Sequence, residues 1–394
     1  MTARADDAFA VELLTRMVET PSVSGDEGAV AGLVTSYMAR AGLDTTVDDA
    51  GNAIGVVGAG APTIVLLGHL DTVGGHVPVR VDDGRLYGRG AVDAKGALAA
   101  FVCAAARHGE RGGTVVVAGA TGEETPESPG ARHLRDRLDP DVVVVGEPSG
   151  WAGVTIGYKG RVCLTYEARR AAQHSSHPSP GAAEAAVGFW LEVARAIEES
   201  PRGPRAFDQA SARLDAIDAT SMTARVDASC RVPPGFDFAS FDRRIARAAG
   251  TDVVRVRERT AAVVGERDSI AVRALSLAIR AEGGVPALKL KSGTSDMNVV
   301  AERWSVPMVA YGPGDSALDH TDDEHVALDE YLRSVRVLTG ALERLQAMWE
   351  QEHALSGARP DAAHTGGDGD GAAPYTPDEE LALAERLKSL GYIE

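Results

Sequence analysis

Apolar residues recur at helical spacing over residues 8–20, and this pattern predicts a helix near the N-terminus. A second helix is expected to begin at Ser24, with Glu27 three residues later completing a capping box, and to end near Gly42. The next two short runs favour strands joined by a tight turn, because Gly-Asn separates them. These runs predict a hairpin of residues 45–48 and 53–57.

Three continuous apolar runs follow, and each leads into polar residues capable of chemistry. They are residues 63–67, before His69 and Asp71; residues 114–118, before Glu123 and Glu124; and residues 142–145, before Glu147. Continuous runs of Val, Ile and Leu that alternate with helical segments indicate strands buried on both faces of a mostly parallel sheet. The polar residues would then lie beyond the carboxyl ends of the strands, where open α/β sheets place their active sites.

The pattern changes near Trp151, from which point apolar and polar residues alternate as in half-exposed strands. Near Arg267 the alternation of helix and buried strand resumes, and it ends in a long helix from about Asp323. We therefore predict an α/β fold, a mixed and mostly parallel sheet flanked by helices, carrying an inserted α+β domain. The predicted domains are a discontinuous catalytic domain of residues 1–155 and 266–352 and an insert of residues 156–265.

The C-terminal part has a different composition. Residues 353–375 are rich in Gly, Ala and Asp with almost nothing to bury, which predicts a flexible linker. Residues 376–394 show helical periodicity in their leucines. Two interpretations stay open for this last stretch: an appended docking helix, or a tail helix with no partner.

The formal net charge of −17 argues against a nucleic-acid-binding protein, which would need a basic surface. No apolar run is long enough to cross a bilayer, and the first residues lack the apolar stretch of a secretory signal. The three cysteines stand far apart and form no CxxC pair, so we expect reduced structural thiols. A cytoplasmic protein that contacts neither membrane nor nucleic acid is the expectation.

Two pairs of polar residues suggest a metal site. In an extended segment His69 and Asp71 point to the same side, as a ligand and the carboxylate that orients it would. Glu123 and Glu124 repel each other at the end of a buried strand unless a cation or a proton compensates their charge. One could bind a metal ion while the other acts as general base. The alternative is a pair of solvated loop carboxylates.

Asp93, Glu147 and His320 each have a structural interpretation when considered alone. Asp93 could cap a helix over residues 94–107, Glu147 could be an ordinary carboxylate at a strand end, and His320 could be a surface histidine. The whole set changes this, because each residue follows a predicted strand or stands in a neighbouring loop. Imidazoles mixed with carboxylates suit Zn²⁺ or a similar first-row ion, whereas Ca²⁺ prefers oxygen alone.

Five segments in this order resemble the metal-site motifs of the M20 peptidase family: GHLDTV, GRGAVDAKG, TGEE, GEPS and LDHT. The resemblance implies a zinc-peptidase-like fold and two divalent metal ions, most often zinc, with cobalt as an alternative. Transferred residue by residue, it implies that His69 and Glu147 hold one metal ion, that Glu124 and His320 hold the other, and that Asp93 bridges them. It also implies a cis peptide bond after the bridging aspartate.

The same resemblance implies roles around the metal ions. Glu123 would take a proton from the attacking water and later give it to the leaving amine, while Asp71 would steady His69. The insert would serve as a dimerisation or lid domain. Its His174 would reach the partner subunit's site in a homodimer and stabilise the oxyanion. His177 is the alternative for that role.

Further segments are similar to the branch of the family that releases lysine or ornithine from the terminal glutamate of a small, acidic amino-group carrier protein. These segments contain the expected substrate contacts Lys159, Thr294 and Asn298. A chain of charge −17 should repel an acidic carrier, unless local basic residues such as Arg169 and Arg170 offset the repulsion.

Three other functions stay open at this point. Two are enzymatic: a deacylase for acetyl-ornithine or succinyl-diaminopimelate, and a dipeptidase that uses the same metal ions. The third is a metal-dependent binding protein without turnover. Glu123 argues against the third, because a binding site needs ligands but no general base beside them.

Overall fold

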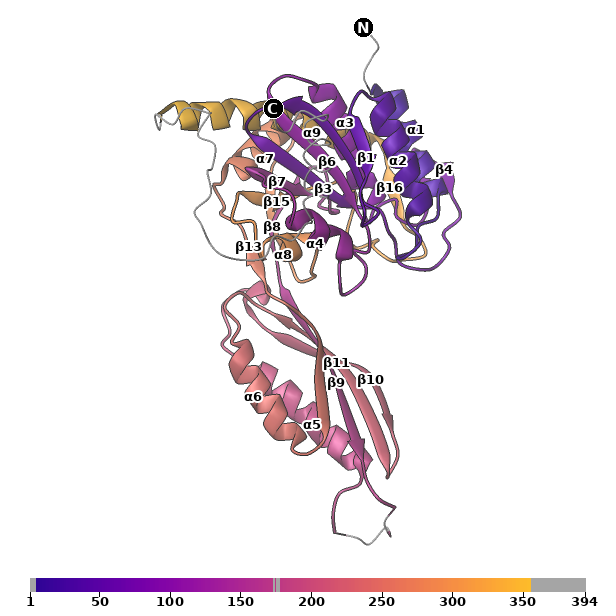
Figure 1. Ribbon diagram of the computed structural model, residues 1–394, viewed down its shortest axis with the longest axis vertical. Coiled ribbons are helices and arrows are strands. Elements are labelled where there is room, and N and C mark those ends of the chain that lie inside the picture. Colours follow the sequence, from indigo (N-terminus) through magenta and orange to yellow (C-terminus); the bar gives the residue numbers. More distant parts are fainter. Residues whose placement is uncertain (1–4, 173, 175–177, 356–394) are drawn as a thin grey trace, which may run out of the picture. The chain divides into compact units, whose positions relative to one another are not determined.

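The computed structural model describes residues 5–172, 174 and 178–355, and its elements form two compact units (Figure 1). The first unit contains the described residues up to Ile156, Gly265–Lys289 and those from Arg303 onward. The second contains Gly157–Val264 and Leu290–Glu302. The sequence pattern predicts residues 290–302 as part of the catalytic domain, whereas in the structure they cluster with the insert. Residues 353–355 of the predicted linker are helical instead, and the rest of the linker and the predicted C-terminal helix lie outside the described residues.

The first unit is built on a sheet whose strands run in the order β1-β2-β6-β3-β7-β15-β8. β3 is parallel to both β6 and β7, and β7 is parallel to β15. β1 and β2 form the predicted antiparallel hairpin, and β2 continues antiparallel onto β6. The bounds are β1 Asp44–Val47, β2 Ala53–Ala59, β3 Thr63–His69, β6 Gly113–Ala120, β7 Val142–Val145, β8 Gly153–Tyr158 and β15 Met308–Ala310.

The three apolar runs form the centre of this sheet, as predicted. Every residue of β6 and β7 is buried, and so is all of β3 after Thr63. Helices cover the sheet: α2 packs against β1 and β2, α3 against β2, β3 and β6, and α7 against β7 and β15. The bounds are α1 Asp7–Glu19, α2 Gly28–Arg40, α3 Lys95–His108, α4 Pro129–Arg135, α7 Ile270–Ala281 and α9 Leu328–Leu355.

The long helix begins later than the sequence predicts, at Leu328 and not near Asp323. Residues in between form β16 (His325–Ala327), which joins β4 (Arg80–Asp82) and β5 (Arg85–Tyr87) in a small three-stranded sheet. Glu324, just before this strand, is buried. The short strands of this sheet were not predicted, because three residues are too few to show a period.

The second unit contains a four-stranded antiparallel sheet in the order β10-β11-β9-β12, with two helices packed against it (Figure 1). The alternating segments form β9 and β11, as predicted, and their inward residues pack against α5 and α6. The bounds are β9 Gly160–Arg169, α5 Ala182–Glu198, β10 Ser211–Ala219, β11 Thr223–Val232, α6 Phe238–Ala249 and β12 Val253–Thr260. The remaining elements are the short 3-10 helix η1 (Ala206–Asp208), β13 (Val263–Val264), β14 (Ala287–Lys291) and α8 (Asp296–Val300).

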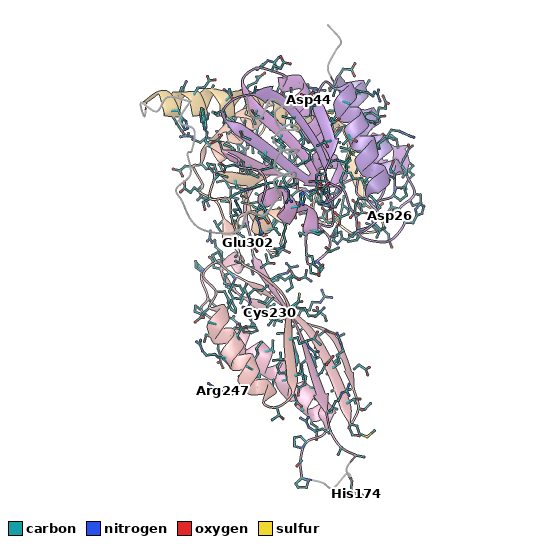
Figure 2. All side chains as sticks on the ribbon, in the orientation of Figure 1. Asp26, Asp44, His174, Cys230, Arg247 and Glu302 are labelled. Atoms are coloured by element: carbon teal, nitrogen blue, oxygen red, sulfur yellow. The ribbon has the colours of Figure 1, made fainter. Side chains whose placement is uncertain are left out.

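Two expectations about the chain as a whole can be compared with the structure. All three cysteines are buried and free; Cys230 lies in the sheet of the second unit (Figure 2). Within the described ranges, no helix combines the length and the apolar character needed to cross a membrane.

Candidate active site

The predicted metal ligands gather at the carboxyl ends of the parallel strands. His69 is the last residue of β3 and pairs in register with Ala120, the last residue of β6. On the other side of β3, Leu67 pairs with Val145. His69 and Glu147 each stand two residues beyond that pair, on neighbouring strands that are about 4.8 Å apart. The sheet therefore brings together side chains that are far apart in the sequence.

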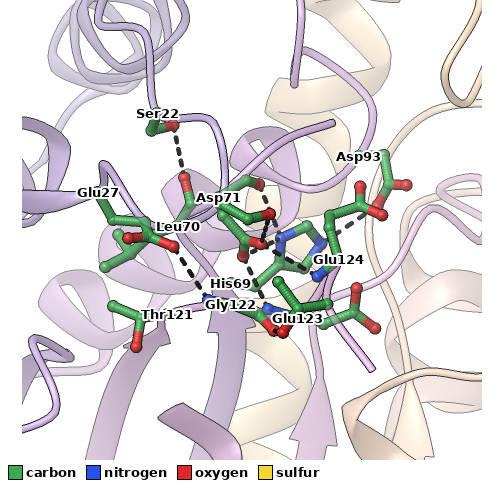
Figure 3. Close-up of polar contacts among 12 residues, drawn as sticks. Ser22, Glu27, His69, Leu70, Asp71, Asp93, Thr121, Gly122, Glu123 and Glu124 are labelled. Atoms are coloured by element: carbon green, nitrogen blue, oxygen red, sulfur yellow. Dashed lines mark hydrogen bonds and ion pairs between the residues drawn. The ribbon is translucent and has the colours of Figure 1, made fainter. Parts of the chain in front are cut away.

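Asp71 is fully buried and organises the loop after β6 (Figure 3). Its Oδ1 accepts a hydrogen bond from the backbone N–H of Glu123 at 3.0 Å, and its Oδ2 accepts one from the N–H of Glu124 at 3.0 Å. The same Oδ2 accepts from the Ser24 hydroxyl at 2.7 Å. Asp71 therefore fixes the backbone of both glutamates.

The contact between Asp71 and His69 is less direct than predicted. His69 Nδ1 lies 3.0 Å from the backbone oxygen of Asp71 and 3.4 Å from its Oδ1. The shorter contact, to the carbonyl, is the one with hydrogen-bonding distance for an N–H donor. It leaves Nε2 directed toward Asp93, whose Oδ1 lies 3.3 Å away. His69 thus presents Nε2 to the site.

Asp93 lies between the two histidines. Its Oδ2 is 3.1 Å from His320 Nε2, and that nitrogen is 2.9 Å from Glu124 Oε1. Ligand atoms of Asp93, Glu124 and His320 all lie within 4.8 Å of one another. Asp93 contacts one histidine with each carboxylate oxygen, which is the arrangement expected of a bridging ligand. The helix-capping alternative is not observed, because the N-cap of α3 is Ala94; the Asp93–Ala94 bond is cis.

The charged groups around Asp93 shift one another's pKa values. Burial raises the pKa of Glu124, and the neighbouring Asp93 raises it further. The hydrogen bond to Asp93 and the charge of Glu124 raise the pKa of His320 to about 9, against the opposing effect of partial burial. Burial alone would lower the pKa of His69, but its carboxylate partners bring that pKa well above the usual value. Closely spaced carboxylates therefore favour the protonated form of both histidines.

A divalent cation at the same place would offset this charge in place of the protons. Imidazole nitrogen mixed with carboxylate oxygen is a donor set that suits zinc and related ions. The residues therefore fit a metal site. Glu147 is buried beyond β7. Its place as a ligand remains a prediction.

The prediction that Ser24 and Glu27 cap a helix is wrong. The expected capping box is absent: α2 begins at Gly28, its N-cap is Glu27, and no side chain caps it. Glu27 Oε1 instead accepts from the N–H of Gly25 at 2.9 Å and of Gly122 at 3.2 Å, next to Glu123 (Figure 3). Both side chains support the site loops, a use that short-range spacing does not reveal.

The predicted substrate contacts lie in the second unit. Lys159 Nζ donates to the Gln209 carbonyl at 2.6 Å, and the Thr294 hydroxyl accepts from Arg231 at 3.2 Å. The amide nitrogen of Asn298 donates to the carbonyls of Lys159 and Ala261. Asn298 thus holds the local backbone, and a role of any of the three toward substrate stays a prediction.

His174 is described and exposed, beyond the end of β9 (Figure 2). The alternative residue, His177, lies outside the described residues. Arg170, suggested as a local basic residue for the carrier, is engaged elsewhere. Its guanidinium donates to both carboxylate oxygens of Asp252, at 2.6 and 2.7 Å.

Solved structures of similar fold include a tripeptidase from Staphylococcus aureus, with a TM-score of 0.73 and 18% identity. The structural match covers 88% of this chain and 100% of the tripeptidase chain. An M20 family metallo-carboxypeptidase from Sulfolobus solfataricus has a TM-score of 0.69 and 15% identity, covering 86% of this chain and 99% of that one. At such identities the likeness concerns the fold.

Sequence comparison reaches further. The chain is 43% identical over 360 residues to the [LysW]-lysine hydrolase of Deinococcus radiodurans, covering 88% of this chain and 99% of that protein. It is 30% identical over 300 residues to the [LysW]-lysine/[LysW]-ornithine hydrolase of Saccharolobus islandicus, and this match covers 73% of this chain and 82% of that protein. Residues 65–344, which contain every predicted metal ligand, match the model of peptidase family M20/M25/M40. With most of its length matched, this protein is a member of peptidase family M20/M25/M40.

Proposed function

We propose that this protein is a metal-dependent amide hydrolase that releases lysine, ornithine or a related diamino acid from the terminal glutamate of an amino-group carrier protein. One observation carries the hydrolytic part. Asp71 fixes the backbone of Glu123 and Glu124 together, so that one carboxylate lies in the candidate metal group while its neighbour is held beside it. The names of the relatives support the substrate class.

We assign the metal ligands as follows. His69 and Glu147 would hold one ion, Glu124 and His320 would hold the other, and both ions would share Asp93. Zinc is the proposed metal, and cobalt the alternative, because both accept a mixture of imidazole and carboxylate ligands. When bound, such ions supply Lewis-acid activation of water and of the amide carbonyl.

The protein's own residues then move the proton. Glu123 accepts a proton from the attacking water as the water oxygen bonds to the carbonyl carbon. The bond between carbon and nitrogen breaks, and Glu123 gives the proton to the departing amine. The second proton of the water passes from the new carboxyl group through Glu123 to the same amine, so the products are the glutamate carboxylate of the carrier and the free amino acid with its amino group protonated. Glu123 ends as it began, so no further acid or base is needed.

Oxyanion stabilisation is assigned to His174 of a second copy. Within the second unit, His174 follows Arg169, the last residue of β9, whereas Lys159 precedes its first residue. A ten-residue strand is about 33 Å long, so His174 and Lys159 belong to opposite ends of the unit. If Lys159 faces substrate, the histidine that serves the same substrate must come from another subunit.

The second unit offers surfaces for such a homodimer. β10 is an edge strand of the four-stranded sheet, with Ile217 44% exposed. An unpaired edge can add a strand from another copy. The adjacent helix α5 exposes Val187 and Leu191.

The three free buried thiols support a reducing, cytoplasmic compartment.

The test compares substrates on one enzyme preparation. Purified enzyme is incubated with carrier-linked lysine, carrier-linked ornithine, N-acetyl-ornithine and N-succinyl-diaminopimelate, and the released amine is quantified. We expect turnover of a carrier-linked substrate at least tenfold faster than of the free acyl amino acids. Faster turnover of the free compounds would instead make the protein a deacylase.

Glu123→Ala is the matched variant. It should bind the same amount of metal as the native protein but lose nearly all kcat, because it removes the proton carrier and no proposed ligand. Retained turnover would disprove the assignment of the general base. Metal binding by native protein without turnover of any substrate would indicate a binding protein.

A further inference from the structure

Glu324 is a buried carboxylate that the proposed mechanism does not use. It stands four residues after His320, and only 1% of its surface is exposed. Its Oε1 accepts hydrogen bonds from the backbone N–H of Val92 at 3.0 Å and of Asp93 at 3.2 Å. Its Oε2 accepts from Arg89 Nη1 at 2.8 Å. The side chain therefore reaches from one ligand-bearing loop into the other.

Arg89 completes the connection in the opposite direction. The same Nη1 donates to the Thr321 carbonyl at 3.0 Å, and Thr321 directly follows His320. The backbone N–H of Gly88 donates to the Glu324 carbonyl at 3.1 Å. Two segments more than 200 positions apart in the chain are thus joined by hydrogen bonds from side chain and backbone on both sides.

These contacts converge on the two residues whose spacing matters for a metal ion. The backbone N–H of Asp93 donates to Glu324 Oε1, and Asp93 Oδ2 lies 3.1 Å from His320 Nε2. His320 has a φ of +61°, a left-handed conformation that is unfavourable for a non-glycine residue. Such a conformation persists where the surroundings hold it in place. The Thr321 carbonyl, bound to Arg89, lies immediately beyond this residue.

A purely stabilising role would explain the arrangement less well. A buried ion pair contributes little net stability compared with apolar side chains of the same volume, because both charges lose hydration. In addition, Glu324 Oε1 accepts hydrogen bonds from two backbone N–H groups of the Asp93 loop, one of them that of Asp93 itself. Contacts of this kind behind a metal ligand typically set ligand orientation and metal affinity.

We propose that Glu324, acting with Arg89, is a positioning residue that sets the separation of Asp93 and His320 and so determines the affinity for the metal ion they share. The proposal rests on the ligand assignment in the proposed function. Glu324 touches neither substrate nor metal; it acts through the backbone of the ligand loops.

The test is the isosteric variant Glu324→Gln, in which an amide NH₂ must face either Arg89 or the backbone donors. Metal-free protein is titrated with Co²⁺, followed by visible absorption, and with Zn²⁺, followed by calorimetry. We expect the more weakly held metal equivalent to bind about 10- to 100-fold less tightly than in native protein. At saturating metal, kcat should recover and KM should be unchanged. Glu324→Asp, which keeps the charge but retracts it, should show the same loss with less effect on folding.

Asp252→Asn is the matched control. Asp252 is a shielded carboxylate of the second unit that pairs with Arg170 and accepts from the Tyr166 hydroxyl at 2.6 Å. This variant should lower thermal stability and leave metal affinity unchanged. If Glu324→Gln and Glu324→Asp behave like this control, Glu324 has only a structural role and the proposal is wrong.

His320→Ala separates this proposal from the ligand assignment. If His320→Ala binds both metal equivalents as tightly as native protein, the ligand assignment fails and the Glu324 proposal fails with it. If His320→Ala loses affinity while both Glu324 variants keep it, the ligand assignment stands and only the positioning role is refuted.

Discussion

Replacing Asp71 with Asn tests whether this carboxylate organises the catalytic loop. The native carboxylate accepts three hydrogen bonds: one on Oδ1 from the Glu123 N–H, and two on Oδ2, from the Glu124 N–H and the Ser24 hydroxyl. An asparagine has one oxygen and one NH₂ group. Whichever way the amide is turned, its NH₂ faces the backbone N–H of one of the two glutamates, and that hydrogen bond is lost.

The size of the effect follows from the kind of bond removed. A hydrogen bond to a charged group is worth about 1.5–3 kcal/mol, and the site is fully buried, so water cannot replace the lost partner. Since each 1.36 kcal/mol corresponds to about tenfold in rate, Asp71→Asn should lower kcat roughly 10- to 150-fold if the loss is expressed fully in the transition state. KM should change little, because Asp71 is shielded from substrate.

The assay is steady-state hydrolysis of the preferred substrate at saturating metal, with metal content measured on the same samples. Asp141→Asn is the control, because Asp141 Oδ2 likewise accepts a backbone N–H, from Thr63 at 2.7 Å, but at the other end of β3. The control should lose some stability and keep its kcat. A kcat of Asp71→Asn within threefold of native, at full metal content, would refute the reasoning.

Three further predictions concern the protons on the histidines and the hydrogen bond from Gly122 to Glu27. The pKa of His320 is raised to about 9 and that of His69 is also raised, so zinc binding to the metal-free protein at pH 7 should release at least one proton. Calorimetry in buffers of different ionisation heat measures this release, and identical binding heats in all buffers would contradict it. A raised pKa also means that protonated histidines stabilise the metal-free fold. This stabilisation is complete below the unfolded-state pKa of about 6.5 and is lost as the pH rises through about 9. The melting temperature of the metal-free protein should therefore fall over this pH range, and that of the zinc-loaded protein should not. Glu27→Ala should lower kcat roughly tenfold by freeing the Gly122 N–H beside Glu123 and leave metal affinity near native, whereas unchanged kcat would show that Asp71 alone fixes the loop.

The pattern of apolar residues predicted the central sheet well, for a physical reason. Strands buried on both faces need apolar residues at every position, so β3, β6 and β7 stand out as continuous runs. β10 escaped prediction because most of its residues are exposed, and because the alternation that Ala212 and Leu214 begin is broken by a register shift between Leu214 and Ala216. The strand ends in turn located the candidate ligands, since parallel strands present their carboxyl ends at one edge of a sheet.

The choice of hydrogen-bond partners was decided only in the folded chain. Ser24 and Glu27 have the spacing of a capping box, yet the Ser24 hydroxyl donates to Asp71 and Glu27 accepts from the Gly122 amide. Glu324 looks like one more acid in a polar turn until the fold buries it against the Asp93 loop. Local spacing determines which residues can meet within one element. Which residues do meet across elements depends on packing that brings distant segments together, and that information exists only in the tertiary structure.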